Sequence, residues 1–356
     1  MDSIITNNYP IHFNNKAYEE LNIFVKKNNF SKIIVLTDSN TKLLCLEKFY
    51  SKFDKTCDTA NISFSSGEKN KNLSTCEDLW TSISDYGLDR NSLIINLGGG
   101  VVTDLGGFVA STFMRGIQFI NVPTTLLAMV DASIGGKTGI DLNNIKNQIG
   151  VINNPSMVII DSDFLETLPL EEIKSGFSEM IKHSLITGIK YWESMKLINI
   201  NTFCPGNCFF NSILIKSKIV DNDPFEKGLR KFLNYGHTVG HAIETYCLNT
   251  NSRKDLSHGH SIALGMIIEG HLSTVIHNFN KKLNSEINRF ILINFEKIIF
   301  TDQEIEEIIK LMRFDKKNKN GQINFVLLKT IGEPVFDQKV DVNTIKKSFK
   351  FLNEFS

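Results

Sequence analysis

Short runs of consecutive apolar residues alternate with helical patterns through the first half of the chain. Four of these runs end in turn residues and are predicted to be strands, at 31–38, 91–100, 116–125 and 156–161. Continuous apolar strands separated by helices are typical of a parallel sheet that is covered on both faces. The pattern therefore predicts an α/β architecture of the nucleotide-binding type for this part.

From about Leu165 the pattern changes to long amphipathic helices. Apolar residues recur at helical spacing in 170–186, 209–223, 236–248 and 260–277. The tail adds a helix with a capping box at 301–304, a loop at 315–322, a strand at 323–332 and a last helix after Asp341. We therefore place a domain boundary near residue 160, with a Rossmann-like parallel-sheet domain at 1–160 and a mostly helical domain at 161–356.

Composition excludes several classes of partner. The 356 residues include 39 basic and 39 acidic side chains, so no net charge attracts nucleic acid or an anionic membrane surface. The chain has no apolar run long enough for a membrane span and starts without a signal-like segment, so we expect a cytoplasmic protein. Its 6 cysteines are scattered, and we expect them to be free thiols.

A glycine-rich turn follows the second predicted strand, in "NLGGGVVTDLGGF" at 96–108. Glycines let a pyrophosphate approach the backbone N–H groups at the start of a helix. The match to G-x-G-x-x-G is imperfect, because Thr103 stands where the last glycine is expected. A plain tight turn between strand and helix explains this stretch equally well.

The stretch 122–150 gathers polar side chains around glycines in an otherwise apolar region. They include Thr124, Asp131, Lys137, Lys146 and Asn147. Lysines on a glycine-rich loop beside a nucleotide site suit the binding of phosphate or carboxylate groups. A solvated surface loop is the alternative, but the small residues nearby favour close packing and a binding function.

Three further motifs carry groups that can bind a metal. "GHTVGH" places His237 and His241 on one helix face, Glu179 lies near Lys182 in a predicted helix, and His258 and His260 flank a glycine before another helix. The zincin pattern H-E-x-x-H is absent. One Glu and two His from three elements would leave an open coordination position, which is the signature of a catalytic divalent metal. Spacing alone does not say which His and which Glu bind.

Taken together, "GGGVVTDLGGF", "MRG", "VPTTLLAMVDASIGGKTGIDL", "KNQIG", "SGFSEMIKH", "EKGLRKFLNYGHTVGHAIE" and "HGHSIALGM" resemble 3-dehydroquinate synthase, the sugar-phosphate cyclase of the shikimate pathway. The resemblance runs in order from about Asp38 to Lys317. It implies a lyase that uses NAD and one divalent metal, zinc or cobalt, with an NAD-binding domain at 1–160 and a metal- and substrate-binding domain at 161–356.

The resemblance also implies a role for individual residues. Glu179, His237 and His258 would bind the metal. The NAD site would comprise Asp38, Glu68, Lys71, Gly99, Gly100, Asp104, Thr124, Thr125, Lys146, Phe164, Leu165, Glu166 and Thr167. The catalytic groups would be Lys137, Lys182, Lys216, Arg230, Asn234 and His241. Substrate binding would involve Arg115, Asp131, Asn147 and either Lys316 or Lys317, with Arg115 reaching the phosphate across the interface of a homodimer.

The implied reaction converts 3-deoxy-D-arabino-heptulosonate 7-phosphate to 3-dehydroquinate and phosphate. It proceeds by transient oxidation with NAD, β-elimination of phosphate, reduction and an intramolecular aldol step. The substrate carries a carboxylate and a phosphate, so a neutral protein must gather cations locally to bind it. Positioning and electrostatics would then be the main contribution of the protein.

Three positions depart from the family pattern: His260, Asp141 and Pro224. Of these, His260 could compete as a metal ligand. Two rivals share the expected layout, a cyclase of the valiolone or inosose type and a metal- and NAD-dependent polyol dehydrogenase. Arg230 argues against the first, because a buried guanidinium without a carboxylate partner is costly. The dehydrogenase would not need so many cations, and a non-catalytic relative would be expected to lack a ligand.

Overall fold

The computed structural model describes residues 2–55, 57–143, 145–250, 253–313 and 323–355. They form two compact units. The first comprises Met1–Pro169 and Lys216–Pro224, and the second comprises Leu170–Ile215 and Phe225–Ser356. Our assignment of an NAD domain at 1–160 and a metal and substrate domain at 161–356 stays a prediction, since the geometry alone does not assign those roles.

The first unit contains a seven-stranded sheet with the strand order β1-β2-β9-β6-β5-β3-β4. All its neighbouring strands run parallel except β1, which pairs antiparallel with β2. The strands are β1 (Ile4–Ile5), β2 (Pro10–Phe13), β3 (Lys32–Asp38), β4 (Asp58–Phe64), β5 (Leu93–Gly98), β6 (Gln118–Pro123) and β9 (Val158–Ile160). The four predicted strands correspond to β3, β5, β6 and β9, and the α/β fold class is confirmed.

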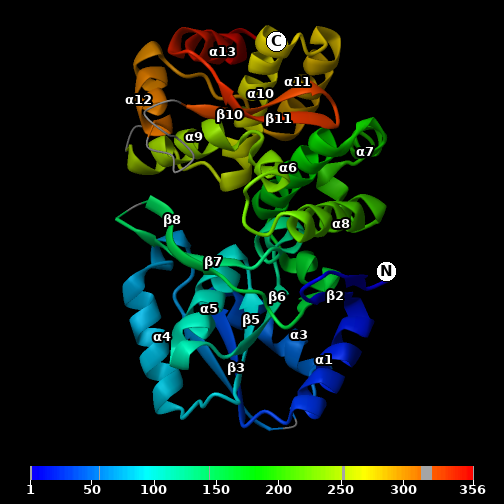
Figure 1. Cartoon of the computed structure of the whole chain (residues 1–356), viewed down its shortest axis with the longest axis vertical. Helices are drawn as coiled ribbons and strands as arrows, with labels where there is room; N and C mark the ends of the chain where they lie inside the picture. The colour runs from blue at the N-terminus through cyan, green and yellow to red at the C-terminus, as the bar shows by residue number, and fades with distance from the viewer. Residues whose placement is uncertain (1, 56, 144, 251–252, 314–322, 356) are drawn as a thin grey trace. The chain divides into compact units, whose positions relative to one another are not determined.

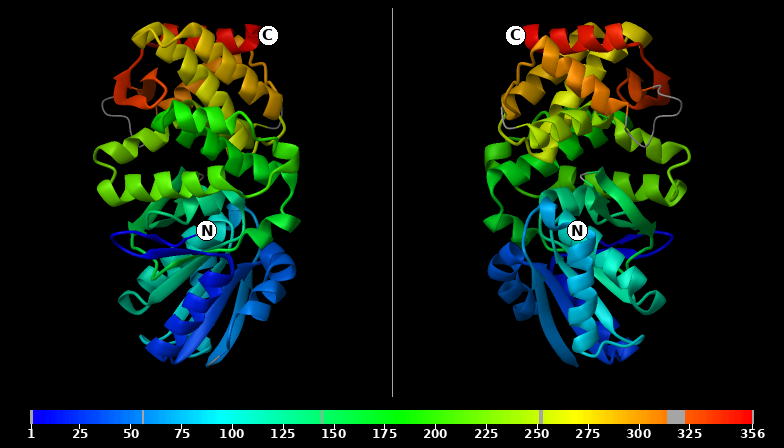
Figure 2. Two further views of the ribbon diagram at one scale, coloured as in Figure 1. Left: turned by 90° about the vertical axis from the view of Figure 1, so that its right-hand side faces the viewer. Right: turned by 90° about the vertical axis from the view of Figure 1, so that its left-hand side faces the viewer.

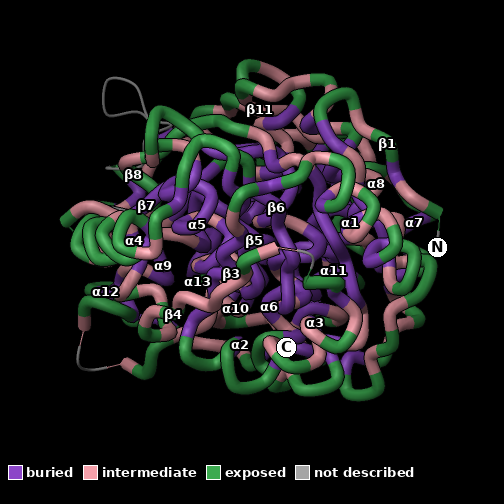
Figure 3. Tube along the Cα trace, turned by 90° about the horizontal axis from the view of Figure 1, so that it is seen from below, coloured by how far each residue is buried: buried purple, intermediate pink, exposed green. Residues whose placement is uncertain are grey.

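Helices cover this sheet (Figures 1 and 2). They are α1 (Asn14–Asn28), α2 (Ser39–Leu44), α3 (Leu46–Lys52), α4 (Leu73–Asp85) and α5 (Gly100–Thr112). Leu79 of α4 and Leu105 of α5 belong to one apolar cluster with Ile34 and Ile94 of the strands. The central strands are buried along almost their whole length (Figure 3), as expected for a parallel sheet.

The described residues of the stretch 122–150 form regular secondary structure instead of a surface loop. It contains a π-helical turn at Ala128–Ala132 and an antiparallel hairpin of β7 (Lys137–Leu142) and β8 (Ile145–Ile152). Gly139 pairs with Gly150 across this hairpin, and a Cβ atom on Gly139 would lie 2.5 Å from the carbonyl oxygen of Ile149. Some of the glycines that read as loop residues therefore let two strands approach closely.

The second unit is mainly helical, as predicted. Its elements are α6 (Leu170–Thr187), α7 (Ile189–Met195), the first part of α8 (Asn207–Asn222), α9 (His237–Asn249), α10 (His258–His277), α11 (Lys281–Asn294), α12 (Asp302–Met312), the hairpin β10 (Asn324–Thr330) and β11 (Glu333–Lys339), and α13 (Val342–Glu354). The capping box of Thr301 and Glu304 opens α12, and Asp341 caps α13. The predicted loop at 315–322 lies outside the described residues.

Helix α10 is the core of this unit. It is apolar around most of its circumference, and α6, α9, α11, α13 and β10 all pack against it. A helix that is hydrophobic on every side is stable only when it is surrounded. None of the helices that the structure describes is both long and apolar enough to cross a membrane. All six cysteines are free thiols, as predicted.

Candidate functional site

The strand order of the first unit places a candidate nucleotide site at the carboxyl ends of β3 and β5. The chain passes from β3 to β4 on one side and then crosses back to β5 on the other side of β3. In open α/β sheets, ligands bind in the crevice outside such a switch point. Asp38 ends β3, and the Gly98–Gly100 turn follows β5.

The glycine turn exposes the start of helix α5. Gly99 is the N-cap residue, and no side chain of the described residues caps the helix. A Cβ atom on Gly99 would lie 3.0 Å from Cγ2 of Thr125, and one on Gly100 would lie 3.3 Å from Cβ of Ala132. Backbone N–H groups at an uncapped helix start are suited to a pyrophosphate, and the absence of side chains keeps them accessible.

The buried side chain of Lys71 is the centre of a polar cluster in the first unit. Its Nζ atom lies 2.6 Å from Oδ2 of Asp104 and 2.5 Å from Oδ1 of Asn147. Burial opposes the charged form of Lys71, but the charges of Asp104 and Glu68 outweigh it and raise the pKa of the ammonium. Glu68 also lies 3.8 Å from Nζ of Lys146. The structure thus brings together five of the residues that we predicted for NAD and substrate.

Asp38 and the segment Phe164–Thr167 are each fixed by local contacts. The carboxylate of Asp38 caps α2, because Oδ1 accepts a hydrogen bond from the backbone N–H of Thr41 at 2.8 Å. Phe164 and Leu165 are buried, whereas Glu166 is exposed and pairs with Lys48 at 2.7 Å. Thr167 ends this 3-10 turn and is exposed.

The remaining predicted residues of the first unit differ in exposure. Lys216 is buried, and its Nζ atom lies 2.6 Å from Oδ1 of Asp131. Thr124 is buried, whereas Lys137 is exposed at the start of β7. Arg115 is exposed and has a positive φ of 70° in the turn after α5. Lys316 and Lys317 lie outside the described residues.

The second unit contains the candidate metal site. Oε1 of Glu179 lies 3.4 Å from Nε2 of His237 and 3.6 Å from Nε2 of His258. The other oxygen of this carboxylate, Oε2, contacts the ammonium of Lys182, which is as deeply buried as Glu179. Three side chains from α6, α9 and α10 therefore converge on one point, with a carboxylate oxygen and two ring nitrogens facing each other.

Both of these histidines have their other ring nitrogen next to an acceptor. Nδ1 of His237 lies 3.1 Å from the carbonyl oxygen of Tyr235, and Nδ1 of His258 lies 3.3 Å from Oε2 of Glu244. An Nδ1–H donor leaves the Nε2 lone pair available for a metal. Burial alone would lower the pKa of His258, but hydrogen bonds and charges of Glu179 and Glu244 raise it to about 9. Without a metal the carboxylates favour the imidazolium, and a cation would replace its proton.

Glycines explain how the three helices come close enough. A Cβ atom on Gly259 would lie 2.2 Å from Cα of Ser175 in α6, and one on Gly240 would lie 2.7 Å from Cδ1 of Ile262 in α10. Gly236 has a φ of 80° and ends the turn before α9. The glycines before the two histidines of "GHTVGH" therefore serve different purposes, since Gly236 makes the turn and Gly240 allows the packing of α9 on α10.

Glu269 of α10 caps the start of α9. Gly236 has no side chain to act as an N-cap, and the buried carboxylate of Glu269 accepts hydrogen bonds from the N–H groups of Gly236 at 2.7 Å and Val239 at 3.2 Å. Sequence reasoning missed both Glu269 and Glu244. Glu244 could have been found, because it lies three residues after His241 and so shares its helix face. No local signal indicates Glu269, since its partners are about thirty residues away.

Of the other predicted residues of the second unit, His241 lies beside the histidines of the metal site, and Arg230 and Asn234 lie in a 3-10 turn. The ring of His241 lies 5.0 Å from that of His237 and 5.7 Å from that of His258, and the three histidines form a group that could hold a metal ion. Arg230 is buried in the 3-10 turn Leu229–Asn234. Asn234 ends this turn and donates a hydrogen bond to Oε1 of Glu226 at 2.7 Å.

The three departures from the family pattern lie in different surroundings. His260 lies on α10, and its Nε2 atom is 2.7 Å from the carbonyl oxygen of Glu296, so that ring nitrogen is engaged away from Glu179. Asp141 accepts a hydrogen bond from the backbone N–H of Asn147 at 2.7 Å within the β7–β8 hairpin. Pro224 lies in the turn after α8.

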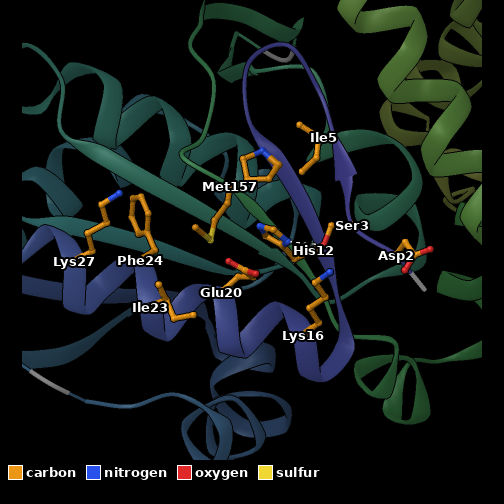
Figure 4. Close-up of a pocket in the computed structure, with 11 residues that line it drawn as sticks. Asp2, Ser3, Ile5, His12, Lys16, Glu20, Ile23, Phe24, Lys27 and Met157 are labelled. Atoms are coloured by element: carbon orange, nitrogen blue, oxygen red, sulfur yellow. Dashed lines mark hydrogen bonds between the residues drawn. The ribbon is translucent and has the colours of Figure 1, made fainter.

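A pocket elsewhere in the first unit contains none of the predicted site residues. It is lined by Asp2, Ser3 and Met157 together with residues of β1, β2 and α1 (Figure 4). His12 lies in this pocket, and its Nδ1 atom is 2.8 Å from Oγ of Ser3. Burial lowers the pKa of this histidine, which keeps it neutral near pH 7.

Comparison with known proteins shows which family the chain belongs to. The model of the N-terminal part of 3-dehydroquinate synthase matches residues 61–175, and that of the C-terminal part matches residues 176–318. A 3-dehydroquinate synthase of Parabacteroides distasonis is 40% identical over 342 residues, which cover 94% of this chain and 95% of that protein. The chain belongs to the 3-dehydroquinate synthase family. The corresponding enzyme of Pelagibacter ubique is 36% identical and covers 96% of this chain and 95% of its own length.

The 3-dehydroquinate synthase fold extends to a rival considered above. A solved 2-deoxy-scyllo-inosose synthase, in complex with carbaglucose-6-phosphate, NAD+ and Co2+, has a TM-score of 0.85 and 24% identity, and the match covers 100% of this chain and 99% of that one. This likeness concerns the fold. The family and activity predicted from the motifs are confirmed by the full-length relatives: the chain is a lyase with 3-dehydroquinate synthase activity in the shikimate pathway.

Proposed function

We propose that this 3-dehydroquinate synthase holds one divalent metal through Glu179, His237 and His258. The observation that carries the proposal is the position of Oε1 of Glu179 within 3.6 Å of the Nε2 atoms of both histidines. One carboxylate and two imidazoles suit zinc or cobalt and leave a coordination position open. His241 then lies beside the ligand set, where it can donate to or accept from a substrate hydroxyl.

NAD is the second proposed cofactor, and the first unit has suitable groups for it. The uncapped start of α5 can bind the pyrophosphate, and Asp38 ends the strand on the other side of the switch point. When bound, NAD supplies a reversible hydride acceptor and the metal supplies a Lewis acid. The Lys71–Asp104 pair fixes the hairpin residue Asn147, which we predicted to bind substrate.

The substrate of the proposed reaction is the heptulosonate 7-phosphate, whose two anionic groups need cations. In the second unit Lys182 and Arg230 are buried cations, and in the first unit Lys216 is buried beside Asp131. Ammonium and guanidinium groups bind carboxylate and phosphate through charge-assisted hydrogen bonds, so these residue types suit an anionic ligand. Arg115, Lys137 and either Lys316 or Lys317 complete the proposed set, with Arg115 acting across a homodimer interface.

Phosphate release from the purified protein tests this proposal. The protein, loaded with NAD and zinc, is given the heptulosonate 7-phosphate, sedoheptulose 7-phosphate or glucose 6-phosphate in parallel. We expect phosphate from the heptulosonate alone and no net NADH, because the hydride returns within each turnover. Release from a sugar without a carboxylate would overturn the role of Arg230, and net NADH would favour a dehydrogenase.

The ligand set has its own test. We expect chelation to abolish activity and His258→Ala to lose the metal, whereas His260→Ala should retain it because His260 contacts the Glu296 carbonyl. A His258→Ala protein with full metal content and normal turnover would refute the assignment.

A further inference from the structure

Glu244 is a buried acidic residue in the second unit to which none of the motifs assigns a role. It lies on α9, two turns after His237, and its side chain is 5% exposed. Its Oε2 atom lies 3.3 Å from Nδ1 of His258, the first residue of α10. A carboxylate on one ligand-bearing helix therefore contacts the ligand that begins the other.

The chemistry of imidazole determines which partner donates the hydrogen bond in this contact. Neutral histidine carries its proton on one ring nitrogen and can bind a metal only through the other. Nε2 of His258 faces Oε1 of Glu179 at 3.6 Å, so Nδ1 is the nitrogen that must carry the proton when a metal is bound. Glu244 is the acceptor beside that nitrogen, which fixes both the tautomer and the plane of the ring.

His237 provides an internal comparison. Its Nδ1 atom is held by a backbone carbonyl, that of Tyr235, at 3.1 Å. A carbonyl belongs to the main chain and cannot be removed by substitution, whereas the acceptor of His258 is a side chain. A hydrogen bond to a carboxylate is also stronger than one to a neutral carbonyl and makes the imidazole a better electron donor. His258 is thus the ligand whose geometry and basicity depend on another side chain.

We propose that Glu244 is a positioning residue for the metal: it accepts the Nδ1–H of His258 and presents Nε2 to the ion beside Glu179. This inference rests on the proposed metal site, and it adds a residue that does not touch the metal or substrate. According to this inference, the affinity of the site for the metal depends partly on an acidic residue that is not itself a ligand.

Metal affinity of Glu244 variants tests the inference. Metal-free wild type, Glu244→Gln and Glu244→Ala are titrated with Co2+ and Zn2+ against a chelator of known affinity, and the visible absorption of bound Co2+ is recorded. We expect Glu244→Ala to bind about 10–100-fold more weakly, the usual cost of losing such a partner, with a changed Co2+ spectrum. Glu244→Gln keeps the shape and one acceptor oxygen, so its loss should be smaller.

Two further variants separate positioning from general damage. Thr245→Ala changes the next residue of α9 and should keep wild-type affinity and spectrum, whereas His258→Ala should bind more weakly than either Glu244 variant. Thermal unfolding of the metal-free proteins shows whether Glu244→Ala is folded, and Glu244→Gln serves if it is not. Equal affinities and spectra for wild type and both Glu244 variants would overturn the inference. Failure of the wild type itself to bind metal would instead overturn the proposed metal site.

Discussion

The candidate sites of the two units are built in different ways. In the first unit, the groups lie where parallel strands end, and the pyrophosphate would meet main-chain N–H groups that Gly99 and Gly100 leave uncovered. In the second unit, the groups are side chains from three helices, and glycines at the helix contacts set their spacing. The candidate nucleotide site follows from the topology of the sheet, whereas the candidate metal site follows from the packing of the helices.

This difference predicts different sensitivity to substitution. Where a site consists of main-chain groups at a switch point, a substitution can abolish ligand binding while the sheet stays folded. A site made of buried charges on packed helices cannot lose a member without affecting stability, because the remaining charges lose their compensation. Four substitutions test this contrast, from the largest expected effect to the smallest.

Glu179→Ala should be the most damaging change. Glu179 and Lys182 are both almost fully buried and paired, so removal of the carboxylate leaves an ammonium in the core. We expect the free energy of unfolding of the metal-free protein to fall by about 3–5 kcal/mol, measured by urea denaturation. Glu306→Ala, which breaks an exposed pair with Lys346, should leave the free energy of unfolding almost unchanged. Equal losses in the two variants would contradict the contrast.

The Arg253–Glu304 pair shows what a partly buried ion pair without a proposed ligand contributes. Hydrogen bonds from Arg253 hold the pKa of Glu304 at about 2, below its ordinary 4.5. Because the folded-state pKa is lowered, the stabilisation is present above about pH 4.5 and is lost as pH falls through about 2. Relative to Glu304→Gln, the wild type should be more stable by about 2 kcal/mol at pH 7, because water near the pair screens part of the interaction.

The direction of this pH dependence is tested by measuring the free energy of unfolding of wild type and Glu304→Gln across that pH range. The difference between wild type and Glu304→Gln should shrink as pH falls. Asp54→Asn, at an exposed pair with Lys26, should show little difference at any pH. A difference that grew in acid would refute the assignment of the pKa shift.

Gly259→Ala should disturb packing and metal together. The new methyl group would lie 2.2 Å from Cα of Ser175, a backbone atom, so α10 must move away from α6. We expect a loss of about 1–3 kcal/mol in stability and a weaker metal complex, because His258 is the adjacent residue. Gly206→Ala, whose methyl group would lie 3.9 Å from the carbonyl oxygen of Cys204, is the matched control. Unchanged metal affinity would show that the packing of α10 on α6 does not control the position of the metal ligands.

Gly99→Ala should have the smallest effect on stability and act on NAD alone. Its methyl group would meet Cγ2 of Thr125 at 3.0 Å, the end of a side chain that can adjust, and Gly99 has a φ that alanine tolerates. We expect the free energy of unfolding to lie within about 0.5 kcal/mol of the wild-type value. NAD should bind about tenfold more weakly, which corresponds to about 1.4 kcal/mol. Calorimetric titration measures this, and Gly259→Ala should bind NAD normally. A stable variant with full NAD affinity would remove Gly99 from the site.

The sequence predicted four of the seven strands of the sheet, β3, β5, β6 and β9, and most of the long helices, because apolar runs and helical periodicity are local signals. It did not predict β1, β2 and β4. It could not predict the β7–β8 hairpin, since glycines such as Gly139 and Gly150 read as loop residues until their pairing is known. The motifs named the candidate ligands, but spacing did not choose between His237 and His241. Distances across three helices were needed to show that Nε2 of His237 faces Glu179.

Glu244 and Glu269 show why the supporting residues escaped notice. Each acts on a group that is distant along the chain: Glu244 on His258, and Glu269 on the first turn of α9. Each is one acidic residue among the 39 in the chain. Glu244 shares a helix face with His241, three residues before it, but neither Glu244 nor Glu269 lies close in the sequence to the group that it contacts. Their roles depend on which helices meet, which is a property of tertiary structure.

The cap that Glu269 provides has a consequence for the order in which the molecule is made. Synthesis proceeds from the N-terminus, so Gly236 and Val239 leave the ribosome before the residue that accepts their hydrogen bonds. The first turn of α9, with His237 at its start, can reach its final form only after α10 has been translated. A nascent chain that ends before Glu269 would therefore contain all three proposed ligands without the contact that fixes one of them.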